Sequence, residues 1–121
     1  MSKPRLIKLP TFKDKRGFLT VWDRGEDIPF EPKRLFWIYS VYPNETRANH
    51  GHKECEQAIF AVRGSFIVRC DNKTFVLFKP ALGVYIPAGI NIKLDTFSLD
   101  AVCLVVASHH YDEDKIINGE Q

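Results

Sequence analysis

Two histidines one residue apart are the side chains of this sequence best suited to chemistry. His50 and His52 lie in the segment RANHGHKECEQ, and Glu56 follows shortly after. Side chains of an extended chain alternate between two faces, so His50, His52 and Glu56 are expected to point the same way. Such a group could bind a metal ion, transfer protons, or form an ordinary solvated strand face. The residue types alone leave all three interpretations open.

The cluster must be positioned by a single small domain. The chain has 121 residues and a net charge of +2, without a basic stripe, so we expect one domain over residues 1–121 and no nucleic-acid partner. No apolar run reaches the roughly 18 residues of a membrane span, and the first residues lack the apolar core of a signal peptide. The three separated cysteines, Cys55, Cys70 and Cys103, favour reduced thiols. We therefore expect a cytoplasmic protein with no membrane partner.

Short runs of β-branched and aromatic residues predict an all-β protein. Turn residues such as Gly, Pro, Asn and Asp separate these runs at near-regular spacing, which is typical of an antiparallel barrel or sandwich. The acidic tail, residues 111–121, is expected to form a loose turn or a short helix. The predicted strands lie within residues 17–23, 33–41, 55–64, 65–70, 74–79, 83–89, 91–97 and 101–108.

The histidine segment resembles the first signature of the cupins, which are double-stranded β-helices of the jelly-roll type. The second cupin signature is a Pro-x-Gly turn followed three residues later by a histidine ligand. Here the turn is present at Pro87 to Gly89, but Ile92 stands at the ligand position. An apolar residue there argues against a retained metal, although His50, His52 and Glu56 could still form a two-histidine, one-carboxylate face suited to ferrous iron.

A more specific resemblance covers nearly the whole chain. The segments DKRGFLTV, IPFEPKRLFWIYSV, GVYIPAG and CLVVASHHYDED, in this order around the histidine segment, look like those of the sugar 3,4-ketoisomerases. The resemblance implies an enzyme that needs no metal or cofactor and acts on a dTDP-linked 4-keto-6-deoxyhexose. Such enzymes move the ketone from C4 to C3 in the biosynthesis of deoxysugars for bacterial surface polysaccharides. It also implies a homodimer in which N-terminal strands are exchanged.

The same resemblance assigns roles to five residues. His50 and His52 are expected to be the catalytic pair, with His50 as the base at C3 and His52 as its partner, although sequence does not distinguish the two roles. Arg47, Arg16 and Tyr39 are expected to bind the substrate, and no residue is expected to bind a metal. Each of these three has an ordinary alternative: a surface arginine, a turn residue before Gly17, and a packing tyrosine.

Two other functions remain as alternatives. Family members commonly carry a histidine or arginine near Asn91 to Lys93, so Ile92 leaves the product configuration and the activity itself open. One alternative is therefore a cupin that binds a nucleotide sugar without converting it. The other is a metal-dependent cupin enzyme that uses His50, His52 and Glu56.

Overall fold

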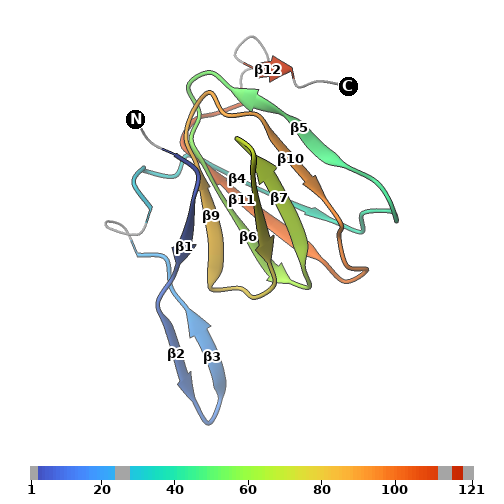
Figure 1. Cartoon of the computed structure of the whole chain (residues 1–121). Coiled ribbons are helices and arrows are strands. Elements are labelled where there is room, and N and C mark those ends of the chain that lie inside the picture. The colour runs from blue at the N-terminus through green and yellow to red at the C-terminus, as the bar shows by residue number, and fades with distance from the viewer. Residues whose placement is uncertain (1–2, 24–27, 112–115, 119–121) are drawn as a thin grey trace.

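The computed structural model of this chain describes residues 3–23, 28–111 and 116–118. These residues form twelve strands and no helix, which confirms the all-β prediction (Figure 1). Within them, no helix has the length and hydropathy required to cross a membrane.

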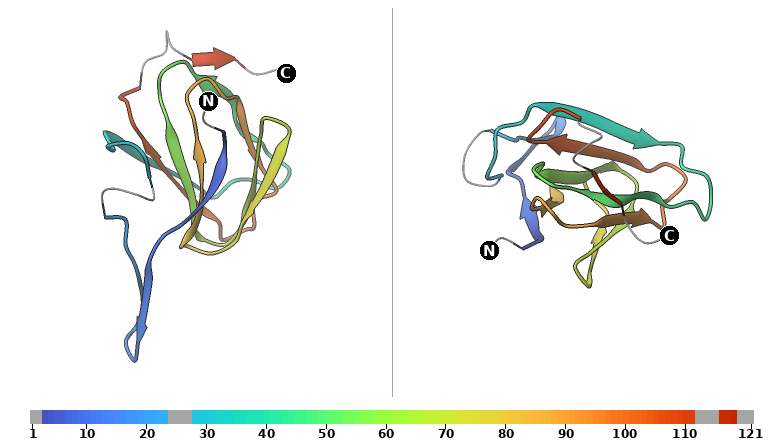
Figure 2. Two further views of the ribbon diagram at one scale, coloured as in Figure 1. Left: turned by 60° about the vertical axis from the view of Figure 1, so that its left-hand side comes forward. Right: turned by 90° about the horizontal axis from the view of Figure 1, so that it is seen from above.

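Two five-stranded antiparallel sheets pack face to face and enclose the interior (Figures 1 and 2). We call them the first and second sheets. The first has the order β1-β9-β6-β11-β4, with bounds Arg5–Lys8, Leu82–Ile86, Gln57–Arg63, Val102–Ala107 and Arg34–Tyr39. The second has the order β12-β5-β10-β7-β8, with bounds Ile116–Asn118, Arg47–His52, Ile92–Asp95, Phe66–Cys70 and Lys73–Leu77. The connections cross repeatedly between the two sheets, as in a jelly roll.

The turns follow the local chemistry of their residues. Asp71 and Asn72 both have positive φ angles, 49° and 59°, as a two-residue type I′ hairpin between β7 and β8 requires. Gly64 has a φ of 67°, and a Cβ atom there would lie 2.3 Å from the Ser98 hydroxyl oxygen, so only glycine fits this position.

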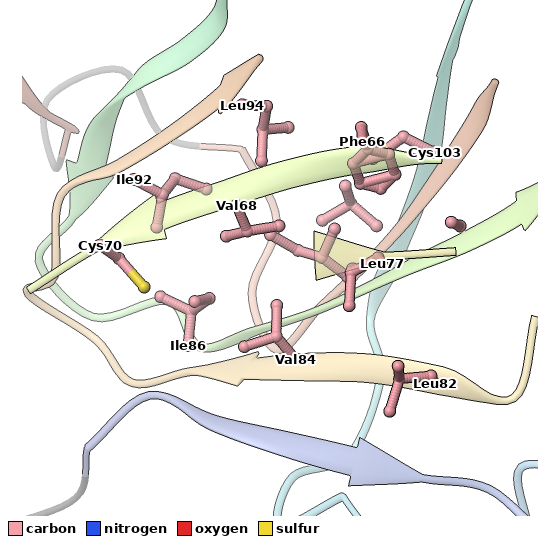
Figure 3. Close-up of a cluster of buried hydrophobic side chains, with 13 residues drawn as sticks. Phe66, Val68, Cys70, Leu77, Leu82, Val84, Ile86, Ile92, Leu94 and Cys103 are labelled. Carbon is pink, nitrogen blue, oxygen red and sulfur yellow. The ribbon is translucent and has the colours of Figure 1, made fainter. Parts of the chain in front are cut away.

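Alternating side chains from both sheets fill the interior with one apolar cluster. Figure 3 shows Cys70, Ile86 and Ile92 grouped at one end of this cluster, while Leu82 and Cys103 lie toward the other end. Burial raises the pKa of the Cys70 thiol to about 11 and that of the Cys103 thiol to about 12, so both remain protonated at neutral pH. Neither thiol is therefore a candidate nucleophile.

The N-terminal hairpin stands apart from the two sheets. It consists of β2 (Thr11–Asp14) and β3 (Gly17–Thr20), which pair only with each other among the described residues. The hairpin projects away from the barrel (Figure 1). Its apolar side chains Phe12, Phe18 and Leu19 are exposed to solvent in this single chain.

One expectation for the C-terminal tail was wrong. Residues 116–118 form a strand, β12, that pairs with the edge of β5, where a turn or short helix was expected. A free strand edge offers unpaired backbone groups, and a short segment can satisfy them whatever its intrinsic preference. The rest of the tail beyond Tyr111 lies outside the described residues.

Candidate active site

The histidine pair lies on the inner side of β5, at the end of the barrel that contains Ile92. His50 is half-buried and His52 is 8% exposed. Their ring centroids are 5.1 Å apart, in an edge-to-face arrangement. His50 is in register with Ile92 of β10, and Ile92 is in register with Cys70 of β7. Directly opposed residues of antiparallel strands share a face, so His50 borders the apolar end of the interior cluster.

The backbone around the histidines is shaped by a bulge and by a glycine. Ala48 and Asn49 both have left-handed φ angles, 71° and 59°, and the register with β10 shifts here. Bulges of this kind bend a strand and reorient the next side chains, and they are common beside active sites. Between the histidines, a Cβ atom on Gly51 would lie 2.7 Å from the Ile90 carbonyl oxygen. Glycine therefore allows the loop before β10 to pack against β5.

The turn at Pro87 to Gly89 is fixed to the same strand. The Gly89 backbone N–H donates a hydrogen bond of 2.6 Å to the carbonyl oxygen of His52. Gly89 has a φ of 87°, which an L side chain rarely adopts. The second cupin-like signature thus supports the histidine strand through its backbone. Ile92, at the position where that signature has its histidine ligand, is 3% exposed and contributes an apolar wall beside His50.

Arg34 is the cation of this site, and the sequence analysis did not single it out. Arg34, Phe36 and Ile38 alternate along β4 on its inner side, whereas Leu35, Trp37 and Tyr39 are exposed. The Arg34 guanidinium lies 5.1 Å from the Phe36 ring centroid and 5.5 Å from that of Tyr111. Its Nε atom is buried and has no hydrogen-bond partner among the described residues, and the same holds for His50 Nδ1. The alternation of Arg34 with Phe36 and Ile38 is the sequence pattern that indicates an inward-facing Arg34 side chain.

Both histidines are held in their neutral form. Burial lowers the pKa of His50; the backbone of His50 partly opposes this effect, and the nearby Arg34 charge adds to it. Burial also lowers the pKa of His52, with additional contributions from His50 and Arg34. Burial and the Arg34 charge both disfavour the imidazolium, so both rings can accept protons at neutral pH. The site thus combines two neutral imidazoles with a half-buried arginine, a set suited to proton transfer with stabilisation of an oxyanion.

Glu56 does not join the histidines, so the expectation that all three side chains converge was wrong. The chain bends at residues 53–54, which interrupts the alternation of an extended strand. Glu56 instead accepts a short hydrogen bond from the hydroxyl of Tyr85. Tyr85 belongs to a second buried cluster on the outer face of the first sheet, with Ala58 and Phe60. Among the described residues, no three His, Cys, Asp or Glu side chains are grouped as metal ligands.

The three predicted substrate-binding residues come from different elements: Arg47 begins the histidine strand β5, Tyr39 ends β4, and Arg16 lies in the turn between β2 and β3. Arg47 and Tyr39 line a common groove with Tyr42 and Glu45. Tyr39 is five residues beyond Arg34 on β4, which corresponds to roughly 16 Å along the strand. Arg16 is exposed at the tip of the β2–β3 hairpin, where it forms an ion pair of 2.5 Å with Asp14. Their substrate-binding roles remain predictions.

Comparison with known proteins identifies the family of the chain. Residues 2–121 match the family model described as FdtA: WxcM-like, C-terminal. A curated relative, the TDP-4-oxo-6-deoxy-alpha-D-glucose-3,4-oxoisomerase of Aneurinibacillus thermoaerophilus, is 32% identical over 117 residues, which cover 93% of this chain and 84% of the relative.

Solved structures of the same type have closely similar folds. A QdtA 3,4-ketoisomerase mutant from Thermoanaerobacterium thermosaccharolyticum, in complex with TDP, matches with a TM-score of 0.92 and 34% identity, covering 98% of this chain and 89% of that one. A 3,4-ketoisomerase from Helicobacter canadensis matches with a TM-score of 0.90 and 30% identity, covering 97% and 91%. The cupin-like jelly-roll barrel expected from the sequence is confirmed, and this chain belongs to the FdtA, WxcM-like family of sugar 3,4-ketoisomerases.

Proposed function

We propose that this protein is a 3,4-ketoisomerase of a TDP-linked 4-keto-6-deoxyhexose and that His50 and His52 transfer the protons. The observation that supports this proposal best is the pair of half-buried and buried imidazoles with lowered pKa values, near Arg34, whose Nε has no hydrogen-bond partner among the described residues. The family supports the substrate class, since QdtA has been solved with TDP and, as a histidine-to-asparagine mutant, with TDP-4-keto-6-deoxyglucose.

The reaction requires a base near C3 and a proton source near C4. The C4 ketone acidifies the C3–H bond, and His50 removes that proton. The C4 oxygen gains a proton, so an enediol forms. The O3 proton then leaves and C4 is protonated, which gives a ketone at C3 and a hydroxyl at C4. His52 relays protons among these positions, and Arg34 stabilises the negative charge that develops on oxygen.

Exchange of the C3 hydrogen in heavy water tests proton abstraction directly. Purified protein incubated with TDP-4-keto-6-deoxyglucose in D₂O is expected to incorporate deuterium and to form the 3-keto sugar, as followed by NMR. A folded protein that produces neither exchange nor product contradicts the proposal. Calorimetric binding of the same nucleotide sugar without exchange would select the non-catalytic alternative. Activity lost after chelation and restored by ferrous ion would select the metal-dependent one.

We also propose that the protein is a cytoplasmic homodimer in which the N-terminal strands are exchanged. The β2–β3 hairpin, with exposed Phe12 and Phe18, projects away from its own barrel. An apolar hollow over the outer face of the first sheet is lined by Leu9, Trp22, Val62 and Leu104, among other residues. A hairpin with free outer edges and exposed apolar side chains favours association with a second copy. The three cysteines are free, as expected for a reducing compartment.

A further inference from the structure

Gln57 is a buried polar residue that the mechanism above does not use. It is the first residue of β6 and is 3% exposed. Ile59 and Ala61, which follow it at intervals of two, both belong to the interior cluster. Side chains two residues apart on a strand share a face, so the Gln57 carboxamide is directed into the barrel. Its register partner Ile86 lies in the same cluster.

The register of the first sheet aligns Gln57 with Arg34. Gln57 is paired with Ala107 of β11, and Ala107 is paired with Arg34 of β4. Ala107 is small, so little side-chain volume separates the amide from the guanidinium. On its other side, Ile86 lies with Ile92 and Cys70 of the second sheet in the interior cluster (Figure 3). Ile92 is in turn the register partner of His50.

Gln57 thus occupies the inner position that Glu56 was expected to fill. The bend after His52 places residue 56 on the outer side of the first sheet and residue 57 on the inner side. A carboxylate at the inner position would pair with Arg34 and offer a third ligand beside two histidines. A carboxamide is neutral and both donates and accepts hydrogen bonds, so it leaves Arg34 and the imidazoles available to a substrate.

We infer that Gln57 is a substrate-contacting residue of this site, whose carboxamide hydrogen-bonds an oxygen of the keto sugar beside the histidine pair. This inference rests on the proposed ketoisomerase function. Hydrogen bonds that involve a developing charge are stronger than neutral ones, so the contact favours the enediol-like transition state over the bound ketone. It should therefore affect turnover of the sugar more than binding of the nucleotide part.

The first test replaces Gln57 by methionine, which has a similar shape and no amide. Met suits the apolar neighbours Ile86 and Ala107, so the variant is expected to fold with a thermal midpoint close to that of wild type. Because a hydrogen bond to a charged group contributes about 1.5–3 kcal/mol, kcat/KM should fall about 10- to 150-fold. The Kd for TDP alone, measured by calorimetry, should not change. Wild-type turnover, or an equal loss of TDP affinity, would overturn the inference.

The second test examines whether residue 57 converges on the histidines, and it does not depend on enzymatic activity. Gln57→His is expected to complete a three-histidine site and to raise Ni²⁺ affinity at least about tenfold over wild type, measured by calorimetry. Lys93→His is the matched control, because Lys93 is exposed on β10 and faces away from Ile92. Equal Ni²⁺ affinity of the two variants would overturn the placement of Gln57. If the wild-type protein shows no C3 exchange, the proposed function fails. The Ni²⁺ affinity of the Gln57→His variant would still show whether residue 57 lies beside the histidines.

Discussion

The inner end of the barrel and the outer face of the first sheet differ in which kind of side chain lacks a contact. Inside, polar groups lack partners: Arg34 Nε and His50 Nδ1 are buried without a hydrogen bond to any described residue. On the outer face, apolar side chains are exposed to solvent: Trp37 is 61% exposed and Leu35 is 56% exposed. Trp37 and Arg34 belong to the same strand, so the two regions are separated by alternation alone.

This difference indicates what each region binds. A buried polar group without a partner is costly, so the inner site favours a polar ligand that supplies hydrogen bonds and negative charge. An exposed apolar face favours a protein surface. The proposed sugar-nucleotide substrate has the chemistry required by the first region, and the proposed second copy of the chain would cover the second. Five experiments test this contrast.

Removing either imidazole should have the largest effect. Replacing His50 or His52 by asparagine is expected to lower kcat about 10²- to 10⁴-fold, the range for loss of general acid–base catalysis. Both variants should retain their far-UV circular dichroism spectra and bind TDP. The His109→Asn variant is the control, because His109 is exposed and its Nδ1 bonds the Ser108 hydroxyl. Unchanged turnover in both barrel variants would remove the catalytic assignment.

Replacing the half-buried Arg34 should have the second-largest effect. Arg34→Met is expected to lower kcat about 10²- to 10³-fold through loss of oxyanion stabilisation. Because the Arg34 charge lowers the pKa of both histidines, its removal should raise both values, as an NMR titration can measure. Lys33→Met removes an exposed charge from the neighbouring position and should alter neither quantity. Near wild-type turnover in Arg34→Met would contradict the role of Arg34.

The outer face can be tested separately by introducing a charge. Trp37→Glu is expected to raise the dimer Kd at least about tenfold, since interface aromatic residues often contribute more than 1 kcal/mol. Analytical ultracentrifugation measures the effect, and Val76→Glu on the exposed side of β8 is the matched control. A wild-type protein that sediments as a monomer at micromolar concentration would contradict the proposed dimer.

Glu56 should matter for stability and not for turnover. Glu56→Gln weakens the hydrogen bond from Tyr85 and is expected to lower the free energy of unfolding by about 1 kcal/mol, measured by urea denaturation. Turnover should stay near the wild-type level, because the Glu56 side chain lies on the other side of the sheet from the histidines. A loss of activity as large as that of His50→Asn would instead support the metal-dependent alternative.

The smallest expected effect is on the pH dependence of stability. His50 and His52 have lowered pKa values, so near pH 6.5 the unfolded chain binds more protons than the folded chain. The free energy of unfolding should therefore decrease as the pH falls through and below that value. The double variant His50→Asn, His52→Asn should show a shallower decrease in urea denaturation at several pH values. An equal slope in both proteins would contradict the lowered pKa values.

Much of the architecture could be predicted from local patterns. Strand alternation and turn residues predicted an all-β barrel, and the spacing of His50 and His52 predicted that they share a face, because both depend on neighbouring residues. Alternation with Phe36 and Ile38 also predicts that Arg34 points inward. The tail strand β12 was missed, because it depends on a free edge of β5 rather than on its own residues.

Only the tertiary structure decided which polar groups meet. The sequence determined an all-β fold with two histidines on the same face of one strand, and the structure showed that this face is the inner one. The bend after His52 shifted the alternation by one residue, so Gln57 faces the interior and Glu56 bonds Tyr85. Cross-strand register brought Arg34 and Gln57, 23 positions apart in sequence, into one row on either side of Ala107. Register and bends depend on the packing of both sheets together, so a local pattern does not specify them.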